Sequence, residues 1–167
     1  MRALLLLVCA SWLGWVQAAE PVLLRVGGMV HNRLHLSAED LLALPHKDYT
    51  ERRSVIVDGR EVVQSVVMRG VPLRTLLDRA GLASDRHSVR RAYVLVTAQD
   101  GYQTVFSWGE LYNTRMGDDV LVLVRHGDDD LLARDGLPTL RALQDVRPGP
   151  RHVRWLSTVD VLLAPSR

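Results

Sequence analysis

Cysteine is almost absent from this chain of 167 residues, and the single one, Cys9, lies in an apolar N-terminal stretch. A domain that begins after this stretch has no thiol, which excludes disulfides, thiolate metal sites and a cysteine nucleophile. Aromatic residues are also few, with one phenylalanine, and no long basic run occurs. Because nucleic-acid surfaces combine basic patches with stacking aromatics, we expect no nucleic-acid partner.

Neither sign of charge predominates, since 21 lysines and arginines stand against 19 aspartates and glutamates, for a net charge of +2. This near balance is not typical of a surface that binds polyanions. After the N-terminal stretch, no apolar run reaches the roughly 20 residues that a membrane span needs. We therefore expect no membrane insertion of the domain itself.

The first 18 residues have the pattern of a secretory signal peptide. Arg2 supplies the short positive segment, residues 3–15 supply the apolar segment, and Val16-Gln17-Ala18 has the small-residue cleavage pattern. We expect cleavage after Ala18 and a periplasmic or secreted product. The remaining residues, 19–167, are enough for one domain with a core of its own.

The rest of the chain alternates short strand and helix patterns. Strands are predicted at 22–26, 34–36, 51–57, 60–68, 92–98, 102–106, 120–124 and 153–163. Asp58-Gly59 between two of them is a strong hairpin signal. Three short helices are predicted: one capped by Ser37 and Asp40, one over 73–80 that stops at Gly81, and one capped by Ser107 and Glu110. The pattern predicts one α/β domain (α+β, rich in strand).

Residues 148–163, reading PGPRHVRWLSTVDVLL, are central to the functional analysis. Pro148, Gly149 and Pro150 hold an extended or turning backbone at the entrance to the last strand. Three potential cations follow beside Trp155, namely Arg151, His152 and Arg154. They are well placed to meet an anion. The same pattern also fits an ordinary strand entered from a basic loop.

Other residues that invite a functional interpretation lack the pattern that it needs. His31 and His35 have the spacing of a helical zinc pair, but their neighbours alternate as in a strand and Asn32 stands where a metalloprotease has glutamate. The aspartates at 128–130 lack the ligand pattern of a calcium loop and are expected in a solvated turn. We find no glycine-rich phosphate loop and no serine in a nucleophile elbow. We therefore predict no metal site and no catalytic residue.

Three segments, in the right order, carry a resemblance to a known family. Residues 70–77 (GVPLRTLL) with 80–82 (AGL), residues 100–102 (DGY) and residues 149–156 (GPRHVRWL) are similar to segments of the oxidoreductase molybdopterin-binding domain. This is the catalytic domain of sulfite oxidases and of periplasmic methionine sulfoxide reductases. Residues 36–42 (LSAEDLL) resemble an early helix of the same family. The resemblance implies the sulfite-oxidase-type fold, with mixed sheets and short helices.

The resemblance also implies a pocket. In the family, residues around the last segment help to bind the pterin cofactor and its phosphate, and the matching positions here are Arg151, His152 and Arg154. Guanidinium groups suit phosphate oxygens. The family's tyrosine in the second segment lies near the substrate, so Tyr102 is expected to face the same pocket. A half-buried strand aromatic is the alternative for Tyr102.

The chain departs from the family at the metal. Family enzymes hold molybdenum through one cysteine thiolate, expected here near residues 56–59, where no cysteine stands. Replacing a soft thiolate would change the metal's electronics and geometry. Exported family enzymes generally use the twin-arginine route because their cofactor is inserted before export, and this signal has only Arg2. We therefore expect no bound cofactor.

Three hypotheses follow. The first is an exported ligand-binding, sensory or accessory module that takes a small anionic ligand or serves a membrane-bound sensor or redox partner. The second is a molybdopterin-dependent oxidoreductase with an atypical ligand set. The third is an interaction protein whose pocket is filled by its own side chains.

Overall fold

The computed structural model describes residues 20–127, 129–130, 136–146 and 149–166. The predicted signal peptide, with its cleavage after Ala18, lies outside the described residues, as do Asp128 and Pro148. Among the residues described, no helix is long and apolar enough to cross a membrane.

Most strands belong to two sheets. The first has the order β2-β1-β11-β5-β6 and is mixed, because β1 runs parallel to β11 and the other pairs are antiparallel. The second has the order β10-β9-β7-β4-β3, with β8 also paired to β7. The bounds of the first sheet are β1 Leu24–Gly28, β2 Leu34–Leu36, β5 Ala92–Ala98, β6 Gln103–Ser107 and β11 Leu156–Leu163. Those of the second are β3 Lys47–Val57, β4 Arg60–Pro72, β7 Val120–His126, β8 Asp129–Asp130, β9 Thr139–Ala142 and β10 His152–Val153.

The helices are short and begin where their capping residues predict. Capping boxes start α1 (Ala38–Ala43), at Ser37 and Asp40, and α3 (Trp108–Asn113), at Ser107 and Glu110. Between them, α2 spans Leu73–Ala80 and ends at Gly81, whose φ of 67° is the left-handed conformation that glycine adopts without strain. Two 3₁₀ turns, η1 (Ser88–Arg91) and η2 (Arg115–Asp119), precede β5 and β7.

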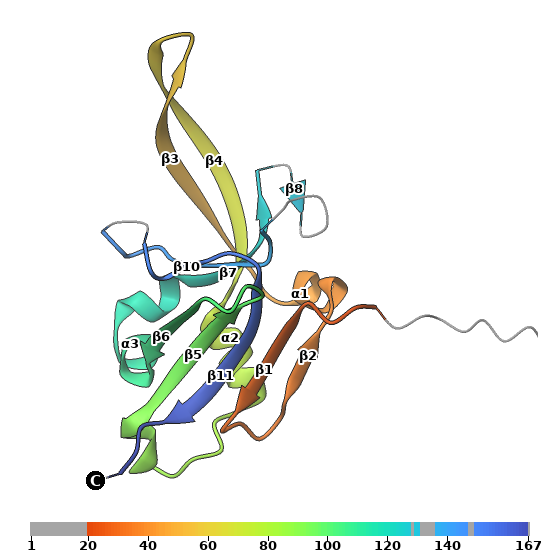
Figure 1. Cartoon of the computed structure of the whole chain (residues 1–167), viewed down its shortest axis with the longest axis vertical. Helices are drawn as coiled ribbons and strands as arrows, with labels where there is room; N and C mark the ends of the chain where they lie inside the picture. The colour runs from red at the N-terminus through yellow and green to blue at the C-terminus, as the bar shows by residue number, and fades with distance from the viewer. Residues whose placement is uncertain (1–19, 128, 131–135, 147–148, 167) are drawn as a thin grey trace, which may run out of the picture.

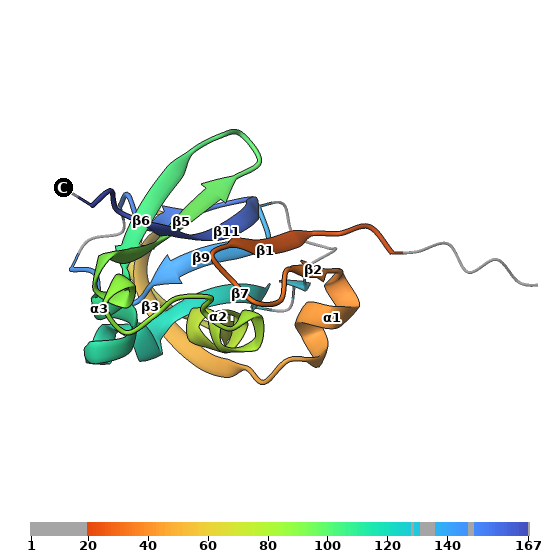
Figure 2. The ribbon, with the colours of Figure 1, turned by 90° about the horizontal axis from the view of Figure 1, so that it is seen from below.

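The core lies between the two sheets and extends under α2. Strand β5 buries every second side chain, whereas residues 120–124 of β7 are all buried. Figure 2 shows the strands of the two sheets one above the other, and α2 packs against β1 of one sheet and β4 and β7 of the other. The apolar residues that recur at helical spacing in α2 are its buried residues: Leu73, Leu76, Leu77 and Ala80. The predicted fold class, a strand-rich α/β domain with short helices, is confirmed.

The prediction of one closing strand over 153–163 is wrong. Val153 belongs to β10 in the second sheet, and β11 begins at Leu156 in the first. Between them the chain turns at Trp155, whose φ is 49° and whose backbone N–H donates to the Gly136 oxygen at 2.8 Å. A bulky residue with positive φ is strained, so surrounding contacts must fix this turn.

Two further differences concern the second sheet. Strand β9 was not predicted, although Thr139, Leu140 and Ala142 in it are buried. Asp129 and Asp130, expected in a turn, pair with β7 as β8.

The Asp58-Gly59 hairpin is longer than predicted. Strands β3 and β4 pair without interruption from Lys47↔Gly70 to Val57↔Arg60. In Figure 1 the far part of this hairpin projects from the body of the molecule. The β4 end nearest the body pairs with β7 from Met68 onward.

Candidate ligand-binding site

Residues 149–155 separate two pockets. Strand β10, in the middle of this segment, pairs with β9 so that His152 lies opposite Arg141. The His152 N–H donates to the Gly149 oxygen at 2.9 Å, which closes a tight turn at the start of the segment. His152 and Gly149 line both pockets.

The outer pocket has a volume of about 340 Å³. This is near the lower limit of the sizes typical of small-molecule sites. It lies between the β5–β6 turn and the segment just described. Its lining residues are Ala98, Asp100, Tyr102, Gly149, Pro150, His152, Arg154 and Trp155. Three of the four predicted site residues, Tyr102, His152 and Arg154, are therefore together here.

Tyr102 joins the two walls of the outer pocket. The Asp100 carboxylate accepts the Tyr102 backbone N–H at 3.0 Å, which fixes the turn before β6. The Tyr102 hydroxyl donates to the Pro150 oxygen at 2.7 Å. Tyr102 as a whole remains 43% exposed. The turn and the hydroxyl contact thus hold an accessible aromatic face at the pocket.

Arg154 is held against Trp155. Its guanidinium carbon lies 4.3 Å from the centroid of the Trp155 ring, a cation–π geometry. On another side Arg154 crosses the backbone at Gly136, where a Cβ atom would lie 2.7 Å from Arg154 Nε. Glycine at 136 therefore permits this close approach, and the cation has a fixed place in the pocket wall.

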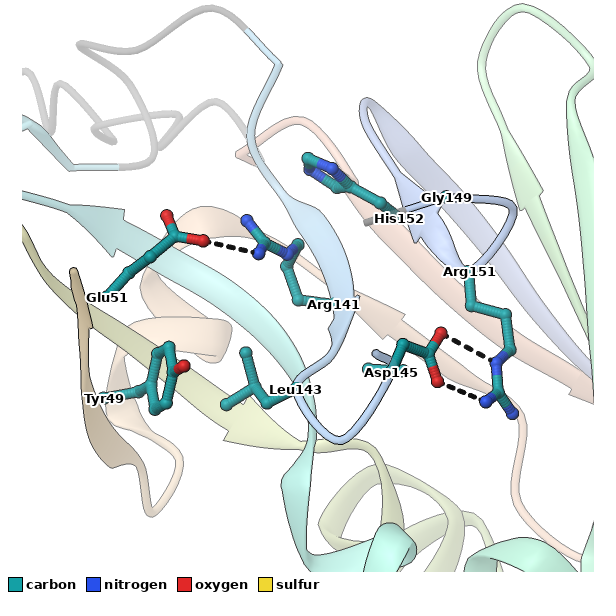
Figure 3. A pocket seen from close by; sticks show the side chains of 9 residues that line it. Tyr49, Glu51, Arg141, Leu143, Asp145, Gly149, Arg151 and His152 are labelled. Carbon is teal, nitrogen blue, oxygen red and sulfur yellow. Dashed lines mark hydrogen bonds and ion pairs between the residues drawn. The ribbon is translucent and has the colours of Figure 1, made fainter. Parts of the chain in front are cut away.

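The inner pocket is much smaller, at about 130 Å³. That volume suits a few water molecules or a small ion. Figure 3 shows two ion pairs on opposite sides of it: Arg141 Nη2 lies 2.8 Å from Glu51 Oε1, and Arg151 pairs with Asp145. His152 and the Tyr49 ring complete much of the wall.

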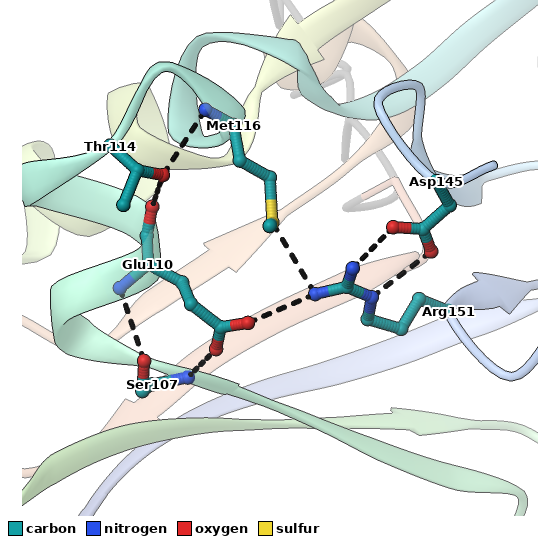
Figure 4. A network of polar contacts seen from close by, with 6 residues as sticks. All are labelled: Ser107, Glu110, Thr114, Met116, Asp145 and Arg151. Atoms are coloured by element: carbon teal, nitrogen blue, oxygen red, sulfur yellow. Dashed lines mark hydrogen bonds and ion pairs between the residues drawn. The ribbon is translucent and has the colours of Figure 1, made fainter.

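Arg151 is surrounded by acceptors of this chain (Figure 4), and it does not line the outer pocket. Its Nε donates to Asp145 Oδ2 at 3.0 Å and its Nη2 to Asp145 Oδ1. Its Nη1 lies 3.2 Å from Glu110 Oε1 and 3.3 Å from Met116 Sδ. The hydrogen bonds to Asp145 raise the pKa of Arg151. The structure thus places Arg151 at the inner pocket, which His152 also lines, and away from Tyr102 and Arg154.

The surroundings of His152 favour its neutral imidazole. Burial lowers the pKa of His152 from 6.5, and the positive charges of Arg141 and Arg154 lower it further, while Glu51 opposes them. Among the side chains that line the outer pocket, in the part of the chain that the structure describes, the permanent cation is Arg154 and the carboxylate is that of Asp100. Of the three potential cations in the sequence, Arg154 and His152 line this pocket and Arg151 does not.

Sequence reasoning missed the roles of four residues that shape the site. They are Asp100, Gly136, Asp145 and Trp155, whose ring contacts the Arg154 guanidinium. Glu110 was identified as a helix cap, and its second oxygen also binds Arg151. Two arginines close together in the sequence are a signal to look for carboxylate partners, but the position of those partners depends on the tertiary fold.

Comparison with known proteins agrees with this architecture. The family described as "Oxidoreductase molybdopterin binding domain" matches residues 13–167. The chain belongs to this family. Its fold is similar to that of the sulfane dehydrogenase SoxCD from Paracoccus pantotrophus, with a TM-score of 0.61 and 18% identity over 89% of this chain and 40% of that chain. The chain thus spans well under half the length of that protein. No curated protein matches.

The described residues do not fit a molybdenum–thiolate centre of the kind the family resemblance implies. The one cysteine, Cys9, lies outside the described residues. Residues 56–59, where the family's cysteine was expected, form the exposed tip of the hairpin (Figure 1) and line neither of the two pockets. Among the described residues, no group of three or more His, Cys, Asp and Glu is placed to hold a metal. The donor set for such a centre is therefore not supplied.

Proposed function

We propose that this chain is an exported ligand-binding module of the molybdopterin-binding family, without a redox-active molybdenum centre. It takes a small anionic ligand in the outer pocket and acts as a sensory or accessory protein for a membrane-bound partner. The observation that carries the proposal is the placement of Arg154, stacked on Trp155 at 4.3 Å, in the wall of a pocket of about 340 Å³.

The chemistry of the lining supports a ligand with one negative charge and an apolar body. The Arg154 guanidinium suits a carboxylate, sulfonate or phosphate head group. Trp155 and Tyr102 offer aromatic surface to the rest of the ligand. The Asp100 carboxylate in the same lining disfavours ligands of higher negative charge.

The test uses benzenesulfonate, which has an anionic head group and an aromatic body and stays ionised near neutral pH. A ligand at a hundred times its dissociation constant stabilises the folded state by about 2.7 kcal/mol. We expect saturable thermal stabilisation of the protein, loss of most of it in Arg154→Ala, and partial retention in Arg154→Lys. Arg25→Ala, an exposed arginine of β1, is the matched control.

Two outcomes contradict the proposal. Equal stabilisation of wild type and Arg154→Ala by benzenesulfonate, or no stabilisation by any of a panel of monoanions, would show that the outer pocket is not the binding site.

The second function, a molybdopterin-dependent oxidoreductase with an atypical ligand set, is favoured by family membership. Stoichiometric molybdenum and redox turnover in protein purified from its native host would establish it instead.

A further inference from the structure

The hairpin carries the main exposed apolar surface of the described chain. We call residues 50–67 the arm, which runs from the pair Thr50↔Val67 to the turn after Val57↔Arg60. Of the eleven large apolar side chains classed as exposed among the described residues, five lie on the arm: Ile56, Val57, Val62, Val63 and Val67. Ile56 is 71% and Val63 65% exposed.

These side chains occupy both faces of the arm. Residues opposite each other in an antiparallel pair share a face, and faces alternate along each strand. Val57 and Val62 therefore lie on one face, and Ile56 and Val63 on the other. A two-stranded hairpin is marginally stable by itself in water, and apolar residues on both faces favour an arm that is covered.

The outer edge of the arm is also open to pairing. In the part of the chain that the structure describes, β3 pairs with β4 alone. The Gly127 N–H donates to the Val67 oxygen at 2.7 Å, on the side of β4 away from β3. Thr50 lies opposite Val67, so its backbone N–H and C=O groups point toward the outer edge of β3. Because the direction of these groups alternates along a strand, those of Arg52, Ser54 and Ile56 point to the same edge.

We propose that two copies of this chain pair through their arms, with the outer edges of β3 antiparallel and a two-fold axis at Val55. In this register Ser54 lies opposite Ile56 of the second copy, and both direct backbone groups to the shared edge. The two most exposed apolar residues of the arm, Ile56 and Val63, gather around the axis on one face. The contact is isologous, because the same patch serves both copies.

Charge complementarity selects this register and this partner. With Val55 on the axis, Arg52 of each copy lies level with Asp58 of the other, in the turn that directly follows β3, and both residues are exposed. Opposite charges at neighbouring positions of two paired strands attract each other. The arm as a whole is balanced, with the acids Glu51, Asp58 and Glu61 and the bases Arg52, Arg53 and Arg60. It therefore has no net positive charge to attract an anionic lipid surface.

The projection of the arm permits such a contact. Its tip stands clear of the body in Figure 1. The two bodies then lie at opposite ends of the paired arms, and each outer pocket, beside the β5–β6 turn and β10, stays accessible. The proposal is thus independent of the ligand proposed above.

A single introduced cysteine tests the two-fold axis. The full chain has one native cysteine, Cys9, so a Cys9→Ala background has none. At the axis, Val55 of one copy lies opposite Val55 of the other, and the backbone groups of both point away from the shared edge. Residues in such non-hydrogen-bonded pairs have Cα atoms about 4.5 Å apart. That separation is within the range of a disulfide. Under mild oxidation we expect Val55→Cys to form a covalent dimer at least about tenfold faster than Val105→Cys, a matched exposed valine of the other sheet's edge strand β6.

Sedimentation equilibrium of the wild-type chain gives a second measurement. We expect a reversible dimer whose dissociation constant rises at least about tenfold in Ser54→Pro, because proline removes an N–H at the outer edge and leaves the β3–β4 ladder intact. Ile56→Lys weakens the dimer similarly, and Val105→Lys leaves it unchanged. A monomer up to about 100 μM, or equal cross-linking of Val55→Cys and Val105→Cys, overturns the proposal. Binding of the monomeric arm to anionic vesicles would overturn it in favour of a membrane surface.

Discussion

Arg151 and Asp145 face each other across the connection between β9 and β10, where one carboxylate accepts two donors of the same guanidinium. This fork geometry is among the stronger polar contacts in proteins. Glu110, which also caps α3, accepts a third donor of Arg151. The three residues therefore tie the segment beside both pockets to α3. Arg151 thus stabilises this segment, and in the proposed function Arg154 is the residue that contacts the ligand.

Arg151→Ala is expected to lower the free energy of unfolding by about 2–3 kcal/mol, because it leaves two partly buried carboxylates without their cation. Arg151→Lys keeps the charge, loses the fork and costs less. Urea denaturation followed by circular dichroism measures both, with Arg25→Ala as a control expected within about 0.5 kcal/mol of wild type. A variant of full stability that has lost ligand affinity would show instead that Arg151 belongs to the binding surface.

Two glycines near α3 should respond to alanine in opposite ways. A Cβ at Gly117, in η2, would lie 2.6 Å from the Leu111 carbonyl carbon, so the backbone must move. We expect Gly117→Ala to destabilise the protein by roughly 2–4 kcal/mol, as other strained core substitutions do. Gly109, in α3, has its nearest neighbour at 3.8 Å.

The matched substitution Gly109→Ala is expected to stabilise the protein by about 0.5–1 kcal/mol, because alanine is the better helix former. Differential scanning calorimetry compares the two. Equal effects of the two substitutions would contradict the close approach of η2 to α3.

Local signals in the sequence predicted the elements well. The capping boxes at Ser37 and Ser107 and the Asp58-Gly59 turn each depend on residues within a few positions of one another. A continuous run of β-prone residues was enough for β5, whose predicted bounds are those observed. The split at Trp155 could not be predicted, because the strained turn depends on the distant backbone of Gly136.

The candidate site was only partly predictable for the same reason. The arginines at 151 and 154 look equivalent in sequence, three residues apart. Arg151 meets Asp145 and Glu110, the second of which is 41 positions away, whereas Arg154 meets Trp155. Which partners each arginine contacts depends on the tertiary fold.

Stability should fall in acid partly through Glu110. The backbone N–H of Ser107 is the main cause that lowers the pKa of Glu110 below 4.5, with smaller contributions from the Ser107 hydroxyl and Arg151. The unfolded chain then binds the proton more readily than the folded one, so stability rises with pH. This contribution is complete above about pH 4.5 and is lost as the pH falls through the folded pKa.

Glu110→Gln keeps an acceptor for Ser107 and cannot titrate. Urea denaturation between pH 5 and 3 should therefore give a shallower loss of stability in this variant than in wild type. Some slope remains, because Lys47 lowers the pKa of Asp119 in the same direction. Identical slopes in the two proteins would contradict the assignment to Glu110.

His152 should make anion binding pH-dependent. Its pKa lies below 6.5, first because of burial and then because of Arg141 and Arg154. An anion beside Arg154 favours the imidazolium, so binding raises the pKa of His152 and, by linkage, acidification strengthens binding. The affinity for benzenesulfonate, which stays ionised, should increase as the pH falls below 6.5, and His152→Gln should remove this dependence. Calorimetric titration at several pH values, with the His152 ring followed by NMR, tests this, and an affinity that is independent of pH would place the anion away from His152.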